Sequence, residues 1–111
     1  MKFTKEKQDD VVVITLKGSL EGGTDTYEIQ DEVKNELEAG SRKFLIDMGK
    51  ASFVNSTGIG VLVASLTSVN DAGGKLKICQ VNDKARRAFV VTGVWSLFDV
   101  HDSAGDAIAA F

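Results

Sequence analysis

Apolar residues occur in short runs separated by polar, glycine-containing segments, and five of these runs have the length and spacing of β-strands. Residues 11–16 are rich in β-branched side chains and predict a strand. Residues 44–48 predict a buried strand. Residues 75–79 alternate polar and apolar side chains, so we expect one face of that strand to be wetter than the other. Residues 3–7 and 97–100 are weaker candidates for strands.

Between the predicted strands at residues 11–16 and 44–48, apolar residues recur at the spacing of a helix. The helix is expected to begin at Thr24 or Asp25, where Asp25 and Glu28 are spaced like a capping box, and to end at Gly40. Residues 18–23 are expected to form the preceding loop. The predicted buried face consists of Ile29, Val33 and Leu37.

Three more helices are predicted further along the chain. One begins at Asn55 or Ser56, both good N-cap residues. Another begins at residues 82–83 and ends at Gly93, and a short alanine-rich helix follows a cap at residues 102–103. The buried stripe predicted for the first of the three consists of Ile59, Leu62, Val63, Leu66 and Val69. Strands that alternate with helices imply parallel pairing, and therefore an α/β fold.

The composition of the chain excludes several classes of function. The chain has 111 residues and a formal net charge of −3 without a basic stripe, so a general nucleic-acid binder is not expected. No apolar run approaches the roughly 20 residues that span a bilayer, and no apolar segment follows the first lysines, so we expect a cytoplasmic protein without membrane insertion. Cys79 is the single cysteine and is expected in the core, and no cofactor is predicted.

The junction before the residue-59 helix holds the most informative chemistry. Ser56 and Thr57 stand where a strand gives way to a helix, beside unpaired backbone N–H groups and the positive end of the helix dipole. A phosphate can be accommodated in such a place. On chemistry alone, capping is the commonest reason for a serine at this position.

The same junction resembles the signature of the STAS domain, in its bacterial anti-sigma factor antagonist branch. The matching run is DMGKASFVNSTGIGVL at residues 47–62. Weaker matches are GSLE at residues 18–21, GGKL at residues 73–76, Phe89, and TGV at residues 92–94. The resemblance implies one STAS-type α/β domain over residues 1–111, with a mixed, mostly parallel sheet of four to five strands and about four helices.

The resemblance also implies a partner-switching role. In the family, the serine that matches Ser56 is phosphorylated by a serine kinase that doubles as an anti-sigma factor. The unphosphorylated antagonist binds this kinase and frees the sigma factor, and a phosphoserine phosphatase resets the switch. Thr57 is the second choice of acceptor. Asn55 and Glu21 both replace an aspartate that is commoner in the family.

The resemblance further predicts a partner-binding surface around this junction and along the helix that follows it. Small residues on the helix would let a partner approach closely, with Val61 as a modest apolar anchor. The alternative is an ordinary solvated helix face. The predicted surface comprises Glu21, Thr24, Asn55, Ser56, Thr57, Gly58, Gly60, Val61, Ala64 and Thr67.

Two other functions stay open at this stage. The same domain could serve a non-sigma partner, a scaffold or a lipid-transport system. A small nucleotide-binding or hydrolytic enzyme is the third hypothesis, although the sequence has no phosphate loop and no Gly-x-Ser-x-Gly elbow. His101 lacks a second ligand at metal-binding spacing, while a dyad with Ser56 remains open. The basic residues at 84, 86 and 87 are expected to be a solvated face.

Overall fold

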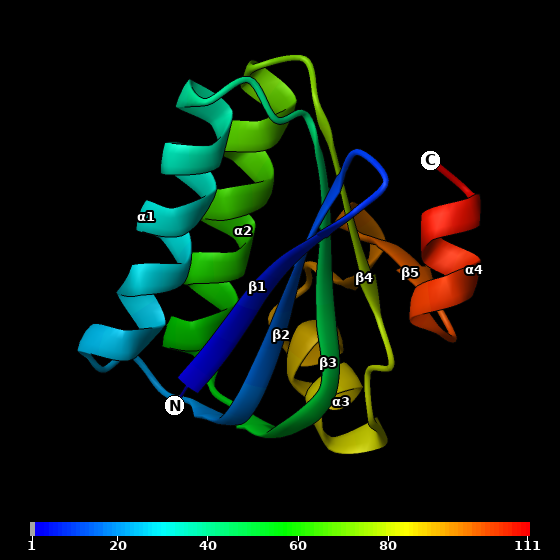
Figure 1. Ribbon diagram of the computed structural model, residues 1–111. Helices are drawn as coiled ribbons and strands as arrows, with labels where there is room; N and C mark the ends of the chain where they lie inside the picture. Colours follow the sequence, from blue (N-terminus) through cyan, green and yellow to red (C-terminus); the bar gives the residue numbers. More distant parts are fainter. Residues whose placement is uncertain (1) are drawn as a thin grey trace.

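Five strands form one sheet in the order β1-β2-β3-β4-β5 in the computed structural model, which describes residues 2–111 (Figure 1). Only β1 and β2 are antiparallel; the other neighbouring pairs are parallel. The predicted mixed, mostly parallel sheet is therefore confirmed, and of the expected domain over residues 1–111 only Met1 lies outside the described residues. The strands are β1 Lys2–Gln8, β2 Val11–Leu20, β3 Lys43–Val54, β4 Lys75–Cys79 and β5 Asp99–His101.

Four helices cover the two faces of the sheet unequally. They are α1 Thr24–Glu38, α2 Ser56–Asp71, α3 Asp83–Val91 and α4 Ala104–Ala109, with a short 3₁₀ turn, η1, at Trp95–Leu97. Helices α1, α2 and α3 pack on one face, and α2 contacts both of its neighbours. Helix α4 packs alone on the other face, against β3, β4 and β5 (Figure 1). Among residues 2–111, no helix combines the length and the apolar character needed to cross a bilayer.

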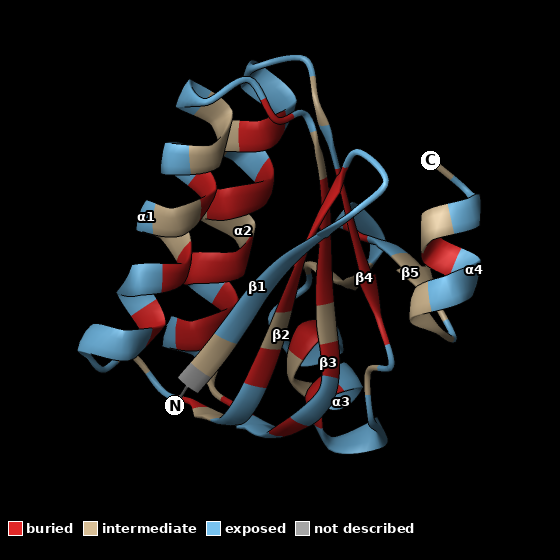
Figure 2. Cartoon of the chain, viewed as in Figure 1, coloured by how far each residue is buried: buried red, intermediate tan, exposed pale blue. Residues whose placement is uncertain are grey.

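Strand β2 shows how one sheet supplies two cores. Its alternate residues Val12, Ile14 and Leu16 belong to the large core under α1, α2 and α3. Val11 and Val13 point the other way, into the smaller core under α4. Figure 2 shows the resulting concentration of buried residues along the central strands and on the inward sides of the helices. The uninterrupted apolar run at residues 11–14 thus reflects a strand that is covered on both faces.

The two central strands are longer than the sequence pattern predicts. Strand β2 continues through Gly18, which has φ +79°, to Leu20, so the predicted loop at residues 18–23 shrinks to three residues. Strand β3 continues to Val54 rather than ending at Met48. The pairing of the two strands shifts register around Gly18, which lets both continue beyond the polar residues that seemed to end them.

Helix α1 begins at Thr24, as predicted, but its cap differs from the prediction. Its N-cap is Gly23, with no side-chain cap hydrogen bond, so the capping box of Asp25 and Glu28 is wrong. Instead, the Gly22 N–H donates to Oγ1 of Thr26 at 3.2 Å. Gly40, with φ +101°, follows the predicted C-terminus as expected.

An aromatic cluster closes the core beside α3. The Phe89 ring is fully buried, and its centroid lies 5.8 Å from that of Trp95 and 5.2 Å from that of Phe98. Trp95 belongs to η1, and β5 begins only at Asp99. The strand predicted at residues 97–100 is therefore displaced along the chain, because the aromatic rings dock in the core before the strand forms.

The face of β4 that was expected to be wetter is covered by α4 instead. Lys77 is 6% exposed and forms an ion pair with Asp99, while its Nζ lies 5.1 Å from the centroid of the Phe111 ring. Cys79 is buried as predicted, and burial, with the negative charge of Asp47, raises the pKa of its thiol to about 12. The polar positions of the alternating pattern at residues 75–79 thus include a buried lysine, Lys77, whose charge is compensated by Asp99.

We expect Asp99→Asn to destabilise the fold by about 1–3 kcal/mol at neutral pH, because Lys77 then lacks a charged acceptor. The ion pair with Lys77, and secondarily His101, holds the pKa of Asp99 below its ordinary value of 3.8. The carboxylate therefore stabilises the fold above pH 3.8, and this contribution disappears as the pH falls through the lowered pKa.

Urea unfolding at several pH values checks this expectation. The stability difference between the wild type and Asp99→Asn should shrink in acid. Asp102→Asn, at an exposed neighbouring position, is the control. A difference that stayed constant from neutral pH to pH 2 would contradict the assigned role of the ion pair.

Candidate functional site

Ser56 is the first residue of α2 and follows β3 after a single intervening residue. The ends of β2 and β3 lie side by side, with Leu20 paired to Val54. Because both strands end at the same edge of the sheet, the loop at residues 21–23 meets the N-terminus of α2. The sheet therefore places the predicted acceptor and the predicted loop residues together.

Asn55 holds this junction together with both ends of its side chain. Its Oδ1 accepts a hydrogen bond from the Gly58 N–H at 2.9 Å, which caps α2. Its Nδ2 donates to the Glu21 carbonyl oxygen at 3.1 Å, and its backbone N–H donates to the Leu20 carbonyl oxygen at 3.1 Å. An aspartate could cap the helix but could not donate to Glu21. The substitution of asparagine for the commoner aspartate thus adds a link to the loop.

Ser56 is consequently not needed as the cap. Its side chain is exposed and makes no hydrogen bond within the described residues. Thr57 is also exposed, but it packs on the loop: a Cβ added to Gly22 would lie 2.7 Å from Thr57 Cγ2. Of the two neighbouring hydroxyl side chains, Ser56 is thus the less constrained by its surroundings.

Two glycines allow the close approach of the loop to the helix. Gly22 has φ +96° and lies against Thr57, so a side chain there would be both strained and obstructed. Gly58 is buried with its Cα facing the Leu20 carbonyl oxygen, which leaves no room for a Cβ. The contacts of Gly22 and Leu20 with α2 are not predicted from the sequence; the adjacent glycines at positions 22 and 23 are the signal that could have indicated them.

The faces of α2 differ from those predicted at Gly58, Val61 and Val63. Gly58 and Val61 were predicted to belong to the partner surface, but Gly58 is buried and Val61 is 3% exposed, so neither can be part of an exposed surface. Ser65 is also fully buried, with its hydroxyl donating to the Val61 carbonyl oxygen. Val63, which was predicted to be buried, is half-buried. The buried arc is wider than one stripe because α2 packs against α1, α3 and the sheet.

The remaining predicted surface residues vary in accessibility. Glu21, Thr24, Gly60 and Thr67 are exposed, and Ala64 is half-buried. A Cβ added to Gly60 would meet no atom within 4 Å. The exposed part of α2 therefore begins at Ser56 and continues through Gly60 toward Thr67, without Val61.

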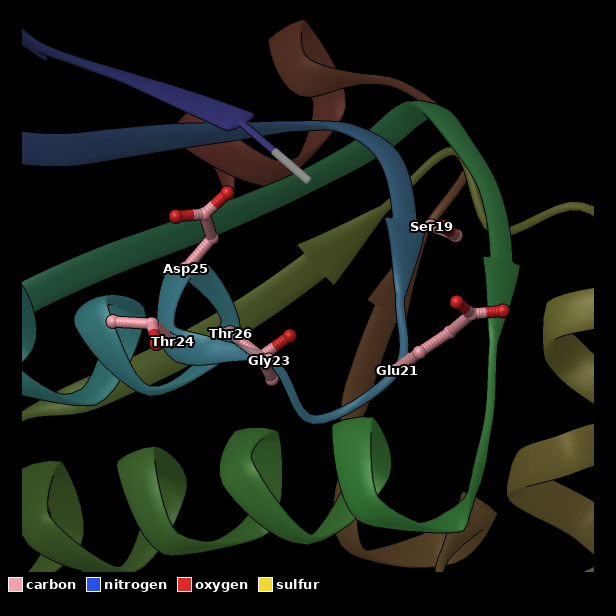
Figure 3. A pocket seen from close by; sticks show the side chains of 6 residues that line it. All are labelled: Ser19, Glu21, Gly23, Thr24, Asp25 and Thr26. Carbon is pink, nitrogen blue, oxygen red and sulfur yellow. The ribbon is translucent and has the colours of Figure 1, made fainter.

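An open hollow of about 230 Å³ adjoins the junction at the start of α1 (Figure 3). The side chains of Glu21 and Asp25 lie on different sides of the loop, and no lysine or arginine lines the hollow. The lining residues are Ser19, Glu21, Gly23, Thr24, Asp25 and Thr26.

The other chemistry considered from the sequence lies elsewhere. His101 is on β5, where its Nε2 lies 3.1 Å from Oδ1 of Asp99, and Ser56 has no hydrogen bond to it. No group of three or more histidine, cysteine, aspartate or glutamate side chains among residues 2–111 could hold a metal ion. Lys84, Arg86 and Arg87 are exposed on α3, as predicted.

Comparison with protein families decides what kind of domain carries this junction. The family model of the STAS domain matches residues 2–107, which include every strand and the Ser56 junction. The chain belongs to the STAS domain family. The resemblance stated from residues 47–62 is thereby confirmed over nearly the whole chain.

Relatives of this STAS domain include regulators of transcription factors. BtrV of Bordetella bronchiseptica, named as a candidate anti-sigma factor antagonist, is 26% identical over 111 residues, which cover 100% of this chain and 95% of BtrV. The anti-sigma-B factor antagonist of Staphylococcus aureus is 27% identical over 95 residues, which cover 86% of this chain and 87% of the relative.

Solved structures of the same fold include both states of one antagonist. Unphosphorylated SpoIIAA matches this STAS domain with a TM-score of 0.83 and 19% identity, covering 97% of this chain and 94% of SpoIIAA. The phosphorylated form of the Bacillus protein matches with a TM-score of 0.76 and 19% identity over 97% of each chain. At this identity, the likeness concerns the fold.

We expect Asn55→Ala to destabilise the STAS domain by about 0.5–2 kcal/mol through loss of the cap, and Ser56→Ala to change stability by no more than about 0.5 kcal/mol. Asn55→Asp should fall between them, because it keeps the cap acceptor and loses the donor to Glu21. Urea unfolding of the three variants checks this order. Equal losses at positions 55 and 56 would contradict the division between cap and free hydroxyl.

Proposed function

We propose that this STAS domain is an anti-sigma factor antagonist that works as a partner-switching regulator. Unphosphorylated, it would bind an anti-sigma factor that is also a serine kinase, and phosphorylation of Ser56 would release it. The observation that supports this most is the exposed Ser56 side chain at the capped start of α2, which makes no hydrogen bond to any of residues 2–111. The names of the relatives BtrV and the Staphylococcus antagonist support the same role.

The proposed switch is electrostatic. A phosphate adds about −1.5 to −2 charges at neutral pH. At Ser56 this charge would stand on an exposed helix start, next to the loop that carries Glu21. A partner that packs closely here would lose contact with the domain, because the phosphate on Ser56 would take up space in the interface. The phosphate would also repel carboxylates of the partner. The cap does not involve the Ser56 hydroxyl, so the domain can keep its fold in both states.

The remaining components follow from this role. The kinase would supply ATP and the catalytic groups, so the domain itself acts as a binding protein rather than as an enzyme. A phosphoserine phosphatase would restore the free hydroxyl, and the exchange would take place in the cytoplasm. The partner surface would run from Glu21 and Thr24 across Ser56 to Gly60, Ala64 and Thr67.

We expect Ser56→Ala to abolish phosphate incorporation by the partner kinase, because the acceptor oxygen is removed while the fold is retained. Ser56→Asp should bind this kinase more weakly than Ser56→Ala, since it places a carboxylate where the phosphate would stand. Radiolabelling and titration calorimetry measure the two effects. Thr57→Val is the matched control and should be labelled normally. Label that persisted at Thr57 in Ser56→Ala would refute the assignment of the acceptor.

A second variant tests the α2 surface separately from the phosphate. Gly60→Arg should cripple kinase binding and preserve the fold, because the new side chain enters open space on the domain but blocks close approach of a partner. Arginine is also a better helix former than glycine. Gly60→Ala is the control and should bind normally with a small gain in stability. Unchanged affinity in Gly60→Arg would show that the partner binds elsewhere.

A further inference from the structure

Two exposed surfaces of opposite charge lie on the outer helices of the three-helix layer, and neither includes a residue of the proposed partner surface. The α1 face consists of Tyr27, Glu28 and Asp31. The α3 face consists of Arg86, Arg87 and Val90. Helix α2 packs against both α1 and α3, so the two faces belong to opposite flanks of the layer (Figure 1).

The α3 face is a hollow lined by one apolar side chain, Val90, and by two arginine side chains. Arg86, Arg87, Val90 and Asp83 line an open space of about 380 Å³. Val90 is 54% exposed, and neither arginine forms an ion pair within residues 2–111. An arginine side chain both stacks on aromatic rings and pairs with carboxylates. The hollow therefore suits an aromatic side chain accompanied by acidic ones.

The α1 face presents that combination. The Tyr27 side chain is 48% exposed on an otherwise polar helix surface, and Asp31 lies one turn further along the same side. Lys5 forms ion pairs with the neighbouring Glu32 and Glu36. Glu28 and Asp31 have no ion pair within the described part of the chain, so their charges are available to another molecule.

We propose that the α1 face of one copy of this domain docks in the α3 hollow of a second copy. The Tyr27 ring would pack against Val90 and a guanidinium group, while Glu28 and Asp31 would pair with the two arginines. Tyrosine and arginine are the residue types that most often dominate interface energies. Because the two faces differ, each docked pair leaves one face of each kind free, and the contact builds short head-to-tail chains.

Sedimentation velocity of the wild-type protein over a range of concentrations tests whether copies associate. The experiment compares an ionic strength of about 0.01 M, where the Debye length is about 30 Å, with about 1 M, where it is about 3 Å. The weight-average sedimentation coefficient should rise with concentration at low salt and much less at high salt.

Charge reversal then tests which surfaces are in contact. Arg86→Glu/Arg87→Glu and Glu28→Lys/Asp31→Lys should each weaken self-association by roughly tenfold or more, because like charges then face each other. An equimolar mixture of the two variants should associate again, since each copy meets the opposite charge on the other. Tyr27→Ser should weaken association, and Tyr27→Phe should preserve it.

Lys17→Glu/Lys50→Glu is the matched control, because it makes the same change in net charge as the α3 variant at exposed positions on β2 and β3. It should associate like the wild type. A wild-type protein that stayed monomeric at low salt would overturn the proposal, as would a variant mixture that failed to associate. Sensitivity to the arginines alone would mean that the hollow contacts a different surface of the second copy, and would overturn the proposal equally.

Discussion

The two hydrogen bonds of the Asn55 side chain are the interactions on which the junction between the β2–α1 loop and α2 depends. One amide group caps α2 and holds the loop after β2, so the first turn of the helix and the turn leading into α1 form one rigid unit. Gly22 and Gly58 also keep the loop and the helix close together, since a side chain at either position would push the two segments apart. A surface built in this way is fixed before any partner arrives, and little order has to be gained on binding.

This rigidity explains how a small chemical change could be read by another protein. The Ser56 hydroxyl stands on a fixed platform, and the contacts that keep the platform in place involve backbone groups and the neighbouring asparagine. A modification of the hydroxyl would then alter what a partner meets and leave the internal contacts intact. The STAS fold itself does not decide which partner that is, because related folds serve different proteins, including one of the sulfate transporter family.

Much of this arrangement could be predicted from the sequence, since alternating strand and helix periods reflect local geometry. The strand pattern of residues 11–16, the buried positions Ile29 and Val33, and the junction at Ser56 all depend on residues close in the chain. Features set by distant segments could not be predicted. Lys77 looked solvated until α4 covered it, and Val61 looked exposed because the extent of contact around α2 is a tertiary property. The role of Asn55 was open for the same reason, since its second hydrogen bond reaches a residue 34 positions away.

The separation of cap and hydroxyl between adjacent residues has an evolutionary consequence. When one serine both caps a helix and carries a modification, any lineage that loses the modification also loses stability. With phosphorylation at Ser56, as proposed, the two duties would be divided between Asn55 and Ser56, so selection could act on the response without acting on the fold. A single substitution at position 56 would then give a descendant that ignores the signal and still folds, whereas most substitutions at position 55 would remove the helix cap and cost stability. A switch built in this way would be suited to duplication, with some copies kept as switches and others becoming permanently active.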